Sequence, residues 1–139
     1  MLLICSLSIF CSLSAQIREE HLWKDRLLLL FAADDQSRDF TRQINLLTEA
    51  KAEVTERDLK TYRIHPDHAV HPSGKTLSAN FSKRLYEKYE IGQEVGFAIL
   101  LIGKDGTEKL RAREVVPPQR IFRLIDSMPM RQREMRERQ

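Results

Sequence analysis

Cysteine is almost absent from this chain: two of its 139 residues are cysteines, Cys5 and Cys11, and none follows position 11. Both lie in an uncharged apolar stretch at the amino terminus. If that stretch is removed, the mature protein has neither a thiol nor a disulfide. A hydrophobic core must then stabilise the domain without a covalent cross-link. The same absence argues against thiol chemistry in the mature chain.

Long hydrophobic runs are also missing. The stretch over residues 1–16 holds roughly 10 apolar side chains, too few to span a bilayer, and charged residues begin soon after Ala15. This pattern predicts a signal peptide over residues 1–15 and an exported protein, periplasmic or extracellular, without a stable membrane span. No Lys or Arg precedes the run, and cleavage after Ser14 is also compatible. A lipid anchor on Cys11 and a buried amino-terminal strand or helix stay open as alternatives.

A dense block of positive charge is the third absence. Lys and Arg number 23 against 20 Asp and Glu, which gives a net charge of +3 and a pI of about 9.0, but the basic residues are interspersed. Nucleic-acid binding requires clustered positive charge, so we do not expect a nucleic-acid partner. The length suits one compact domain. We place this domain at residues 16–131, followed by a charged tail at 132–139.

Short apolar runs alternate with helical patterns in the first half of this domain. Residues 27–32 form a continuous apolar run, as in a strand that is covered on both faces. Apolar side chains at helical spacing over residues 40–54 predict a long amphipathic helix. Residues 59–64 mix apolar and charged side chains, as expected for an edge strand. A helix between two such strands predicts that the strands pair in parallel.

The second half contains further elements of both kinds. Residues 65–75 hold two prolines and a glycine, which predicts a loop. Three elements follow: a helix capped by Ser78, a fully apolar strand at 97–102 and an amphipathic strand at 109–113. The Asp-Gly pair at 105–106 predicts that these two strands form a hairpin. The last helix begins at Pro117 and ends at Pro129.

The order of the elements restricts the fold. Strands that are apolar on both faces belong in the centre of a sheet, and amphipathic strands belong at its edges. These rules predict an α/β fold of the thioredoxin-like class. The expected sheet is mixed and four-stranded, in the order 2-1-3-4 with the last strand antiparallel, and has helices on both faces.

Four segments carry a family resemblance: WKDRLLLLFA at 23–32, ERDL at 56–59, LIGKDG at 101–106 and IDSMPMR at 125–131. They resemble the family called domain of unknown function 4174, over residues from about 22 to 136. The resemblance implies a thioredoxin-like or peroxiredoxin-like domain of exported bacterial proteins, related to repeated domains in animal extracellular matrix and sushi-repeat proteins. It implies no established activity.

Thiol chemistry in a thioredoxin-like fold needs a thiolate at the start of the helix after the first central strand, where free N–H groups and the helix dipole stabilise the anion. The corresponding residues 32–37 contain no cysteine. No threonine and cysteine pair of the peroxidase type is present, and Val95 and Gly96 stand where thioredoxins carry a cis-proline. A non-catalytic domain is therefore predicted, with a residual oxidoreductase of the thioredoxin or peroxiredoxin type as an alternative.

Asp34 and Asp35 stand at this helix start instead. Two carboxylates in the loop where the fold places its active site can serve as an acid and a base. They can also cap the helix by accepting hydrogen bonds from its free N–H groups, which is the interpretation we favour. We therefore predict no catalytic residue and no cofactor.

The predicted loop carries a histidine run with a spacing of three: His65, His68 and His71, with Asp67 among them. Imidazole is a ligand for zinc, copper and nickel, so a metal-binding protein that uses these histidines is a second alternative. The spacing aligns three side chains only on a helix, and the two prolines argue against one, so we favour a solvated loop. His21 is interpreted as incidental.

Methionines raise the question of copper, because thioethers bind its reduced ion. Met128, Met130 and Met135 lie close together near the carboxyl terminus. Met128 continues the apolar stripe of the last helix, so we interpret it as a core residue.

The remaining hypothesis is binding or scaffolding through the surface, with a protein as the partner. Its contact face is expected at Lys109, Arg111 and Arg113, together with the arginines of the tail. Edge charges also block aggregation. The tail itself suits a membrane surface or an acidic partner, but we favour a solvated extension of the last helix.

Overall fold

The computed structural model of the chain describes residues 13–139. Most of the predicted signal peptide, with Cys5 and Cys11, lies outside the described residues, so the signal stays a prediction. The elements, in chain order, are α1 (Leu13–His21), β1 (Arg26–Ala32), α2 (Arg38–Glu49), α3 (Lys51–Glu56), β2 (Leu59–Ile64), β3 (Ala69–Val70), β4 (Thr76–Leu77), α4 (Ala79–Lys88), β5 (Phe97–Ile102), β6 (Glu108–Ala112), α5 (Pro118–Asp126) and α6 (Pro129–Glu137).

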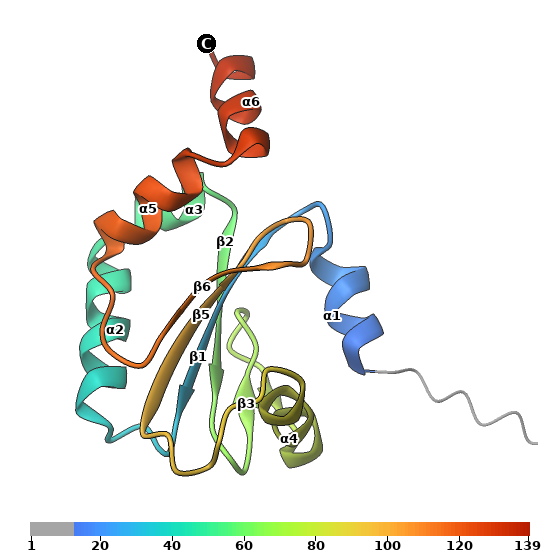
Figure 1. Cartoon of the computed structure of the whole chain (residues 1–139), viewed down its shortest axis with the longest axis vertical. Helices are drawn as coiled ribbons and strands as arrows, with labels where there is room; N and C mark the ends of the chain where they lie inside the picture. The colour runs from blue at the N-terminus through green and yellow to red at the C-terminus, as the bar shows by residue number, and fades with distance from the viewer. Residues whose placement is uncertain (1–12) are drawn as a thin grey trace, which may run out of the picture.

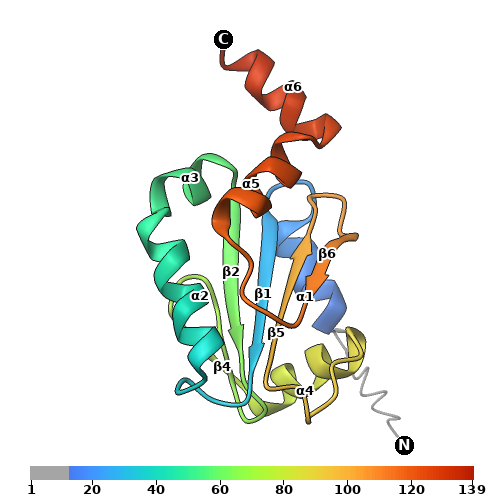
Figure 2. The same ribbon diagram turned by 60° about the vertical axis from the view of Figure 1, so that its left-hand side comes forward.

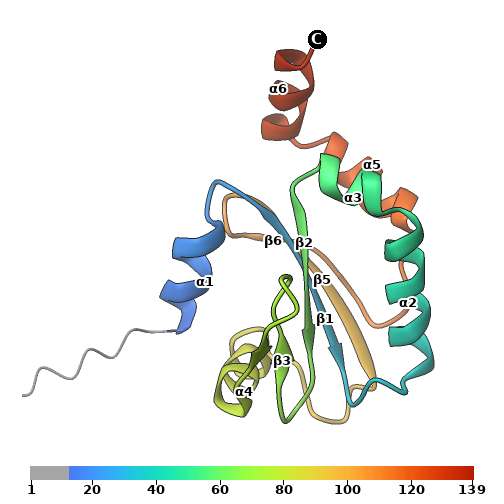
Figure 3. The same cartoon turned by 180° about the vertical axis from the view of Figure 1, so that it is seen from behind.

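Helices pack on both faces of one sheet, as predicted (Figure 1). Helices α1 and α4 lie on one face, and α2, α3 and α5 lie on the other, an arrangement that Figures 2 and 3 show from two further directions. Helix α6 continues past α5 and projects beyond the end of the sheet. Over residues 13–139, no helix combines the length and the apolar character that crossing a membrane requires.

The sheet has six strands in the order β4-β3-β2-β1-β5-β6. The four predicted strands lie next to one another in the predicted order, but the prediction of four strands is wrong. The predicted loop over residues 65–75 turns back along β2, where Ala69 pairs with Ile64 and Val70 with Arg63. Strands β3 and β4 then pair with each other. Because each has two residues, neither leaves an alternating pattern in the sequence.

Strand direction differs from the prediction as well. Strands β1 and β2 pair in parallel, as predicted, but β5 is antiparallel to β1 and β6 is antiparallel to β5. The direction therefore reverses one strand earlier than expected. The β3–β4 hairpin leaves the chain at the carboxyl end of β2, since Leu77 pairs with Ala69 and Ala69 with Ile64, and α4 does not carry it to the opposite end of the sheet. Strand β5 starts at that same end, with Phe97 opposite Ala32, so it must run back against β1.

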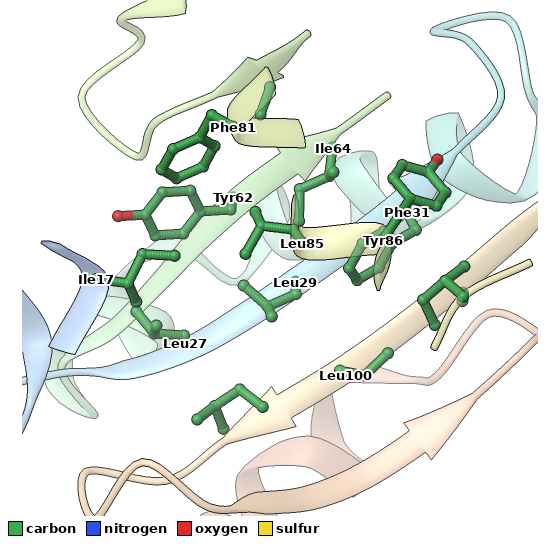
Figure 4. Close-up of a cluster of buried hydrophobic side chains, with 14 residues drawn as sticks. Ile17, Leu27, Leu29, Phe31, Tyr62, Ile64, Phe81, Leu85, Tyr86 and Leu100 are labelled. Atoms are coloured by element: carbon green, nitrogen blue, oxygen red, sulfur yellow. The ribbon is translucent and has the colours of Figure 1, made fainter. Parts of the chain in front are cut away.

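Two hydrophobic clusters cover the two faces of the central strands. Successive side chains of a strand point to opposite faces, so Leu27, Leu29 and Phe31 join α1 and α4, whereas Leu28 and Leu30 join α2 and α5. Every residue of β1 and of β5 is buried. Figure 4 shows the cluster on the α1 and α4 side, where side chains from the sheet and both helices interlock.

Several local signals appear as the sequence predicts. Ser78 caps α4 by accepting a hydrogen bond from the N–H of Phe81 at 3.1 Å. The hairpin between β5 and β6 turns at Gly106, whose φ of 80° lies in the left-handed region that favours glycine. The predicted long helix is divided at Ala50, which separates α2 from α3.

Helix α6 crosses the predicted boundary between the domain and its tail, and Arg131 ties it to the domain. The Arg131 side chain is buried, with 1% of its area exposed. Its guanidinium donates to Asp126 at 3.0 Å and to the carboxylate of Glu56 at 2.9 Å. Arg57 also donates two hydrogen bonds to Asp126. Burial opposes ionisation of Asp126, but these arginines outweigh it and hold the pKa of Asp126 below its usual value.

Glu134 makes a second connection from α6 to the sheet. Its carboxylate accepts hydrogen bonds from the buried Arg26 at 3.2 and 3.3 Å, and from Lys104 at 2.7 Å. Burial alone would raise the pKa of Glu134, but the two cations lower it below its usual value. Lys104 also donates to Asp58 at 2.9 Å. Part of the predicted tail is therefore bound to β1 and to the β5–β6 turn by ion pairs.

Candidate functional site

The start of α2 is the place where thiol enzymes of this fold hold their nucleophile. The Asp34 carboxylate accepts a hydrogen bond from the N–H of Gln36 at 2.8 Å, which closes the turn before the helix. Ser37 occupies the cap position but makes no side-chain cap hydrogen bond. Asp34 therefore shapes the turn before α2 but does not cap the helix as the sequence predicted, because Gln36 lies outside α2.

Asp35 lies beside a buried histidine from the end of β2. Its Oδ1 is 2.9 Å from Nε2 of His65, but out of line for a hydrogen bond. The other ring nitrogen of His65 lies 2.9 Å from the carbonyl oxygen of Ala32, and the Ser82 hydroxyl donates to the His65 carbonyl. The His65 side chain is 1% exposed. His65 thus fixes the ends of β1 and β2 to α4 and is closed to solvent.

Tyr86 also approaches this end of β1. Its hydroxyl lies 3.5 Å from the Ala32 carbonyl oxygen, and burial raises the pKa of Tyr86 to about 12. The phenol is therefore neutral at physiological pH. Neither Tyr86 nor the two aspartates can replace a thiolate as a redox nucleophile.

The three loop histidines do not converge. His68 lies next to His65, with ring centroids 4.9 Å apart, but its Nδ1 contacts the exposed carboxylate of Asp67 at 2.8 Å. That hydrogen bond lowers the pKa of Asp67. His71 lies in the β3–β4 turn and contacts α1 instead. The hairpin that was missed in the sequence separates His71 from the other two.

His71 joins a polar cluster with two residues of α1. Its Nε2 is 2.7 Å from Oε1 of Glu20. The same Glu20 oxygen is 3.7 Å from Nε2 of His21, and the two imidazole rings stack with centroids 6.3 Å apart. One ligand atom from each of Glu20, His21 and His71 lies within 4.8 Å of the others. Among residues 13–139, these three are the His, Asp and Glu side chains that lie close enough together, as a group of three or more, to hold a metal ion.

His21 was interpreted as incidental, but it is the buried centre of this cluster. Its Nδ1 lies 2.8 Å from Asp25 and its Nε2 lies 2.7 Å from the Tyr62 hydroxyl. Burial raises the pKa of Tyr62, and the carboxylates of Glu20 and Asp25 raise it further. Tyr62 therefore stays protonated and donates to His21. The spacing of four between His21 and Asp25 was visible in the sequence, but nothing there indicated Tyr62 or His71 as partners.

The cluster borders a surface pocket with a volume of about 530 Å³. Glu20, Tyr62 and His71 line it together with apolar side chains, among them Ile17 and Phe81. Figure 4 shows the Tyr62 ring beside Phe81, with its hydroxyl directed away from the hydrophobic cluster. A polar group that is reachable from solvent thus lies next to the core on the α1 side.

The predicted contact face is less basic than the sequence suggests. Lys109 pairs with Asp105 and Arg111 pairs with Glu108, both on the same hairpin. Arg113 is exposed. Strand β6, which carries the first two cations, is the last strand on its side of the sheet. The face is therefore an open sheet edge with balanced charge.

Met128 is the cap residue of α6, and Met130 and Met135 lie within this helix. Met128 packs against the hydrophobic cluster of α2 and α5, as predicted for a core residue. Met130 and Met135 are half-buried on α6.

Comparisons with solved structures show the fold. The chain is similar to the reduced 2-Cys peroxiredoxin of Plasmodium vivax, with a TM-score of 0.63, 17% identity and 83% of each chain covered. It is also similar to the mitochondrial 2-Cys peroxiredoxin of Plasmodium falciparum, with a TM-score of 0.57, 14% identity and 78% and 77% of the two chains covered. These likenesses confirm a thioredoxin-like and peroxiredoxin-like fold.

Sequence comparisons identify relatives of the same domain. The human sushi repeat-containing protein SRPX2 is 26% identical over 128 residues, which are 90% of this chain and 27% of that protein. The chain thus spans about a quarter of the length of this relative. The family described as domain of unknown function DUF4174 matches residues 18–134. That match includes all four segments that suggested the family and most of the described chain, so the protein belongs to the DUF4174 family.

Proposed function

We propose that the chain is an exported binding or scaffolding module and not a thiol enzyme. The observation that carries this proposal is the start of α2, where the fold offers a thiolate site and the chain has Asp34 and Asp35. Cysteine is absent from residues 12–139. The nearby His65 is buried and holds backbone elements together.

Electrostatics support this interpretation. Carboxylates next to a thiol raise its pKa, because two negative charges repel each other. A loop with two aspartates is therefore a poor environment for the low-pKa thiolate that peroxidase or disulfide chemistry requires. The site lacks both a thiol and the surroundings that would make a thiol reactive.

The β6 edge is the proposed contact face. A free edge strand presents unpaired N–H and C=O groups to which an extended segment of a partner can add. The exposed side chains of Lys109 and Arg111 form ion pairs with Asp105 and Glu108 on the same hairpin. Their charges are thus already neutralised, so a partner that pairs with the backbone of β6 does not need to be acidic. We expect a protein partner.

Turnover assays test the first half of the proposal. The full chain is mixed with hydrogen peroxide and a dithiol, and with a disulfide substrate and a reductant. We expect rates no higher than those without protein. Saturable turnover that survives Cys5→Ser and Cys11→Ser would overturn the proposal, because the domain itself would then be the enzyme.

Site-specific cross-linking tests the second half. A photoreactive residue is placed at Arg111 on β6 in the native host, and in a control chain at the exposed Lys51 on α3. We expect a discrete adduct from position 111 that the control does not form. Adducts from position 51 alone would show that the contact face lies elsewhere.

A further inference from the structure

We propose that Glu20, His21 and His71 form a site for one divalent transition-metal cation of the zinc class. Two imidazoles and a carboxylate are ligands that zinc accepts, and three protein ligands leave a fourth position for water. The residues come from α1 and from the β3–β4 turn, so the site exists only in the folded domain. It is independent of the proposed contact face on β6.

The distances are close to those that a bound ion requires. Zinc bonds to nitrogen and oxygen are about 2.0–2.2 Å long, which places neighbouring ligand atoms of a tetrahedral site about 3.3–3.6 Å apart. In the structure, the Glu20 oxygen lies 2.7 Å from His71 and 3.7 Å from His21, and no pair of ligand atoms is more than 4.8 Å apart. Small side-chain rotations therefore complete the geometry.

The exposed members of the cluster have the freedom to make these rotations. The Glu20 side chain is 50% exposed and that of His71 is 21% exposed, whereas that of His21 is 6% exposed. His21 is thus a fixed ligand, and the other two close on the ion from the pocket side.

Asp25 orients His21 for this role. A histidine that binds a metal usually donates its other ring N–H to a carboxylate, which fixes the ring and makes it a stronger ligand. The Nδ1 of His21 makes this contact with Asp25 at 2.8 Å, so Nε2 carries the lone pair. Without a metal, that lone pair accepts the Tyr62 hydroxyl at 2.7 Å. An ion takes the place of this hydrogen bond.

His71 has a partner for the proton that it must carry when a metal is bound. Its Nδ1 now accepts the N–H of Ser73 at 3.0 Å, so its Nε2 holds the proton that faces Glu20. When an ion occupies Nε2, the proton moves to Nδ1. Nδ1 then donates to the Ser73 hydroxyl, 2.8 Å away, and the Ser73 N–H gives up its hydrogen bond to Nδ1.

The other two loop histidines make different contacts. His65 is closed to solvent and lies against the Ala32 carbonyl, and His68 lies against Asp67. His68 therefore provides a matched control: it is a histidine of the same sequence run that this site does not use.

Calorimetric titration with zinc chloride tests the proposal. The full chain is used with Cys5→Ser and Cys11→Ser, because free thiols would bind zinc themselves, and it is first freed of metal with a chelator. We expect one equivalent of zinc to bind. His71→Ala should weaken binding at least ~100-fold and Asp25→Asn about 10-fold or more, since even an orienting partner has effects of that size.

Two further variants decide the outcome. Glu20→Gln should also weaken binding, and His68→Ala should leave it unchanged, with circular dichroism confirming that each variant is folded. The buried His21 is left intact so that loss of binding is not loss of the fold. The proposal is overturned if the chain binds no zinc, if Glu20→Gln and His71→Ala bind as tightly as the parent, or if His68→Ala loses as much affinity as His71→Ala.

Discussion

Removing the guanidinium of Arg131 should destabilise the domain, although Arg131 lies at the edge of the predicted charged tail. We consider Arg131→Met, which keeps much of the buried apolar stem. The substitution removes hydrogen bonds to Asp126 at 3.0 Å, to the Glu56 carboxylate at 2.9 Å and to the Glu56 carbonyl at 3.3 Å. These contacts join α6 to α5 and to the end of α3.

The size of the effect depends on the contacts that Asp126 and Glu56 retain when Arg131 is replaced. Breaking a fully buried ion pair on one side costs about 3–5 kcal/mol. Here Asp126 retains both hydrogen bonds from Arg57, and Glu56, whose side chain is 52% exposed, regains water. Because hydrogen bonds to charged groups contribute about 1.5–3 kcal/mol each and part of that is recovered, we expect a loss of about 2–3 kcal/mol.

Urea unfolding of the full chain, followed by circular dichroism at neutral pH, measures this loss. Arg133→Met is the matched control, because Arg133 is exposed on the same helix. Surface substitutions of this kind change the free energy of unfolding by about 0.5 kcal/mol or less. If Arg131→Met and Arg133→Met have equal unfolding free energies within that margin, α6 is a solvated extension and the reasoning is refuted.

Two further predictions concern pH and export. Cationic neighbours hold the pKa values of Asp126 and Glu134 below their ordinary 3.8 and 4.5, so both carboxylates stabilise the fold at neutral pH, and this stabilisation is lost as the pH falls through their folded-state pKa values. The urea midpoint of the parent protein should therefore drop as the pH is lowered towards about 3. In Arg131→Met the drop should be smaller, because Asp126 has lost one of the cations that lower its pKa. An equal drop in both proteins would contradict the assignment of the pH dependence to these ion pairs. Intact mass of the protein from its native host should show a mature chain that starts at Ala15 or Gln16, whereas a retained Cys5 or a lipid mass on Cys11 would contradict the predicted signal peptide.

The central strands and their order were predictable because burial on both faces leaves a direct record in the sequence. Residues 27–32 and 97–102 are apolar throughout, and every residue of β1 and β5 is buried. The Asp-Gly turn and the Ser78 cap are equally local signals. Each depends on a few neighbouring residues, so no knowledge of the tertiary structure was needed.

Features that depend on distant partners were not predictable. Strands β3 and β4 form because their residues meet β2 and each other, and their two-residue length has no period. The burial of Arg26 and Arg131 was also hidden, because charged side chains ordinarily remain in water. Their carboxylate partners lie on other elements, with Glu134 separated from Arg26 by more than a hundred positions.

The histidine run shows how the missed hairpin affected the interpretation of the site. A spacing of three suggested one loop and a single shared environment for His65, His68 and His71. The β3–β4 hairpin instead leaves His65 at the carboxyl end of β1 and carries His71 to α1. Each histidine was visible in the sequence, but its partners were not, because they are set by the path of the chain.

The polar side chains at the start of α2 and those on the α1 side make contacts of different kinds. At the start of α2, the fold's usual reactive position, Asp34 closes a turn and His65 is buried against Ala32. On the α1 side, Glu20 and His71 line a pocket and share an orienting network that reaches Asp25. The α1 side is therefore the place to test for a ligand, and zinc titration with His71→Ala against His68→Ala separates a site there from a general affinity of histidines for metal.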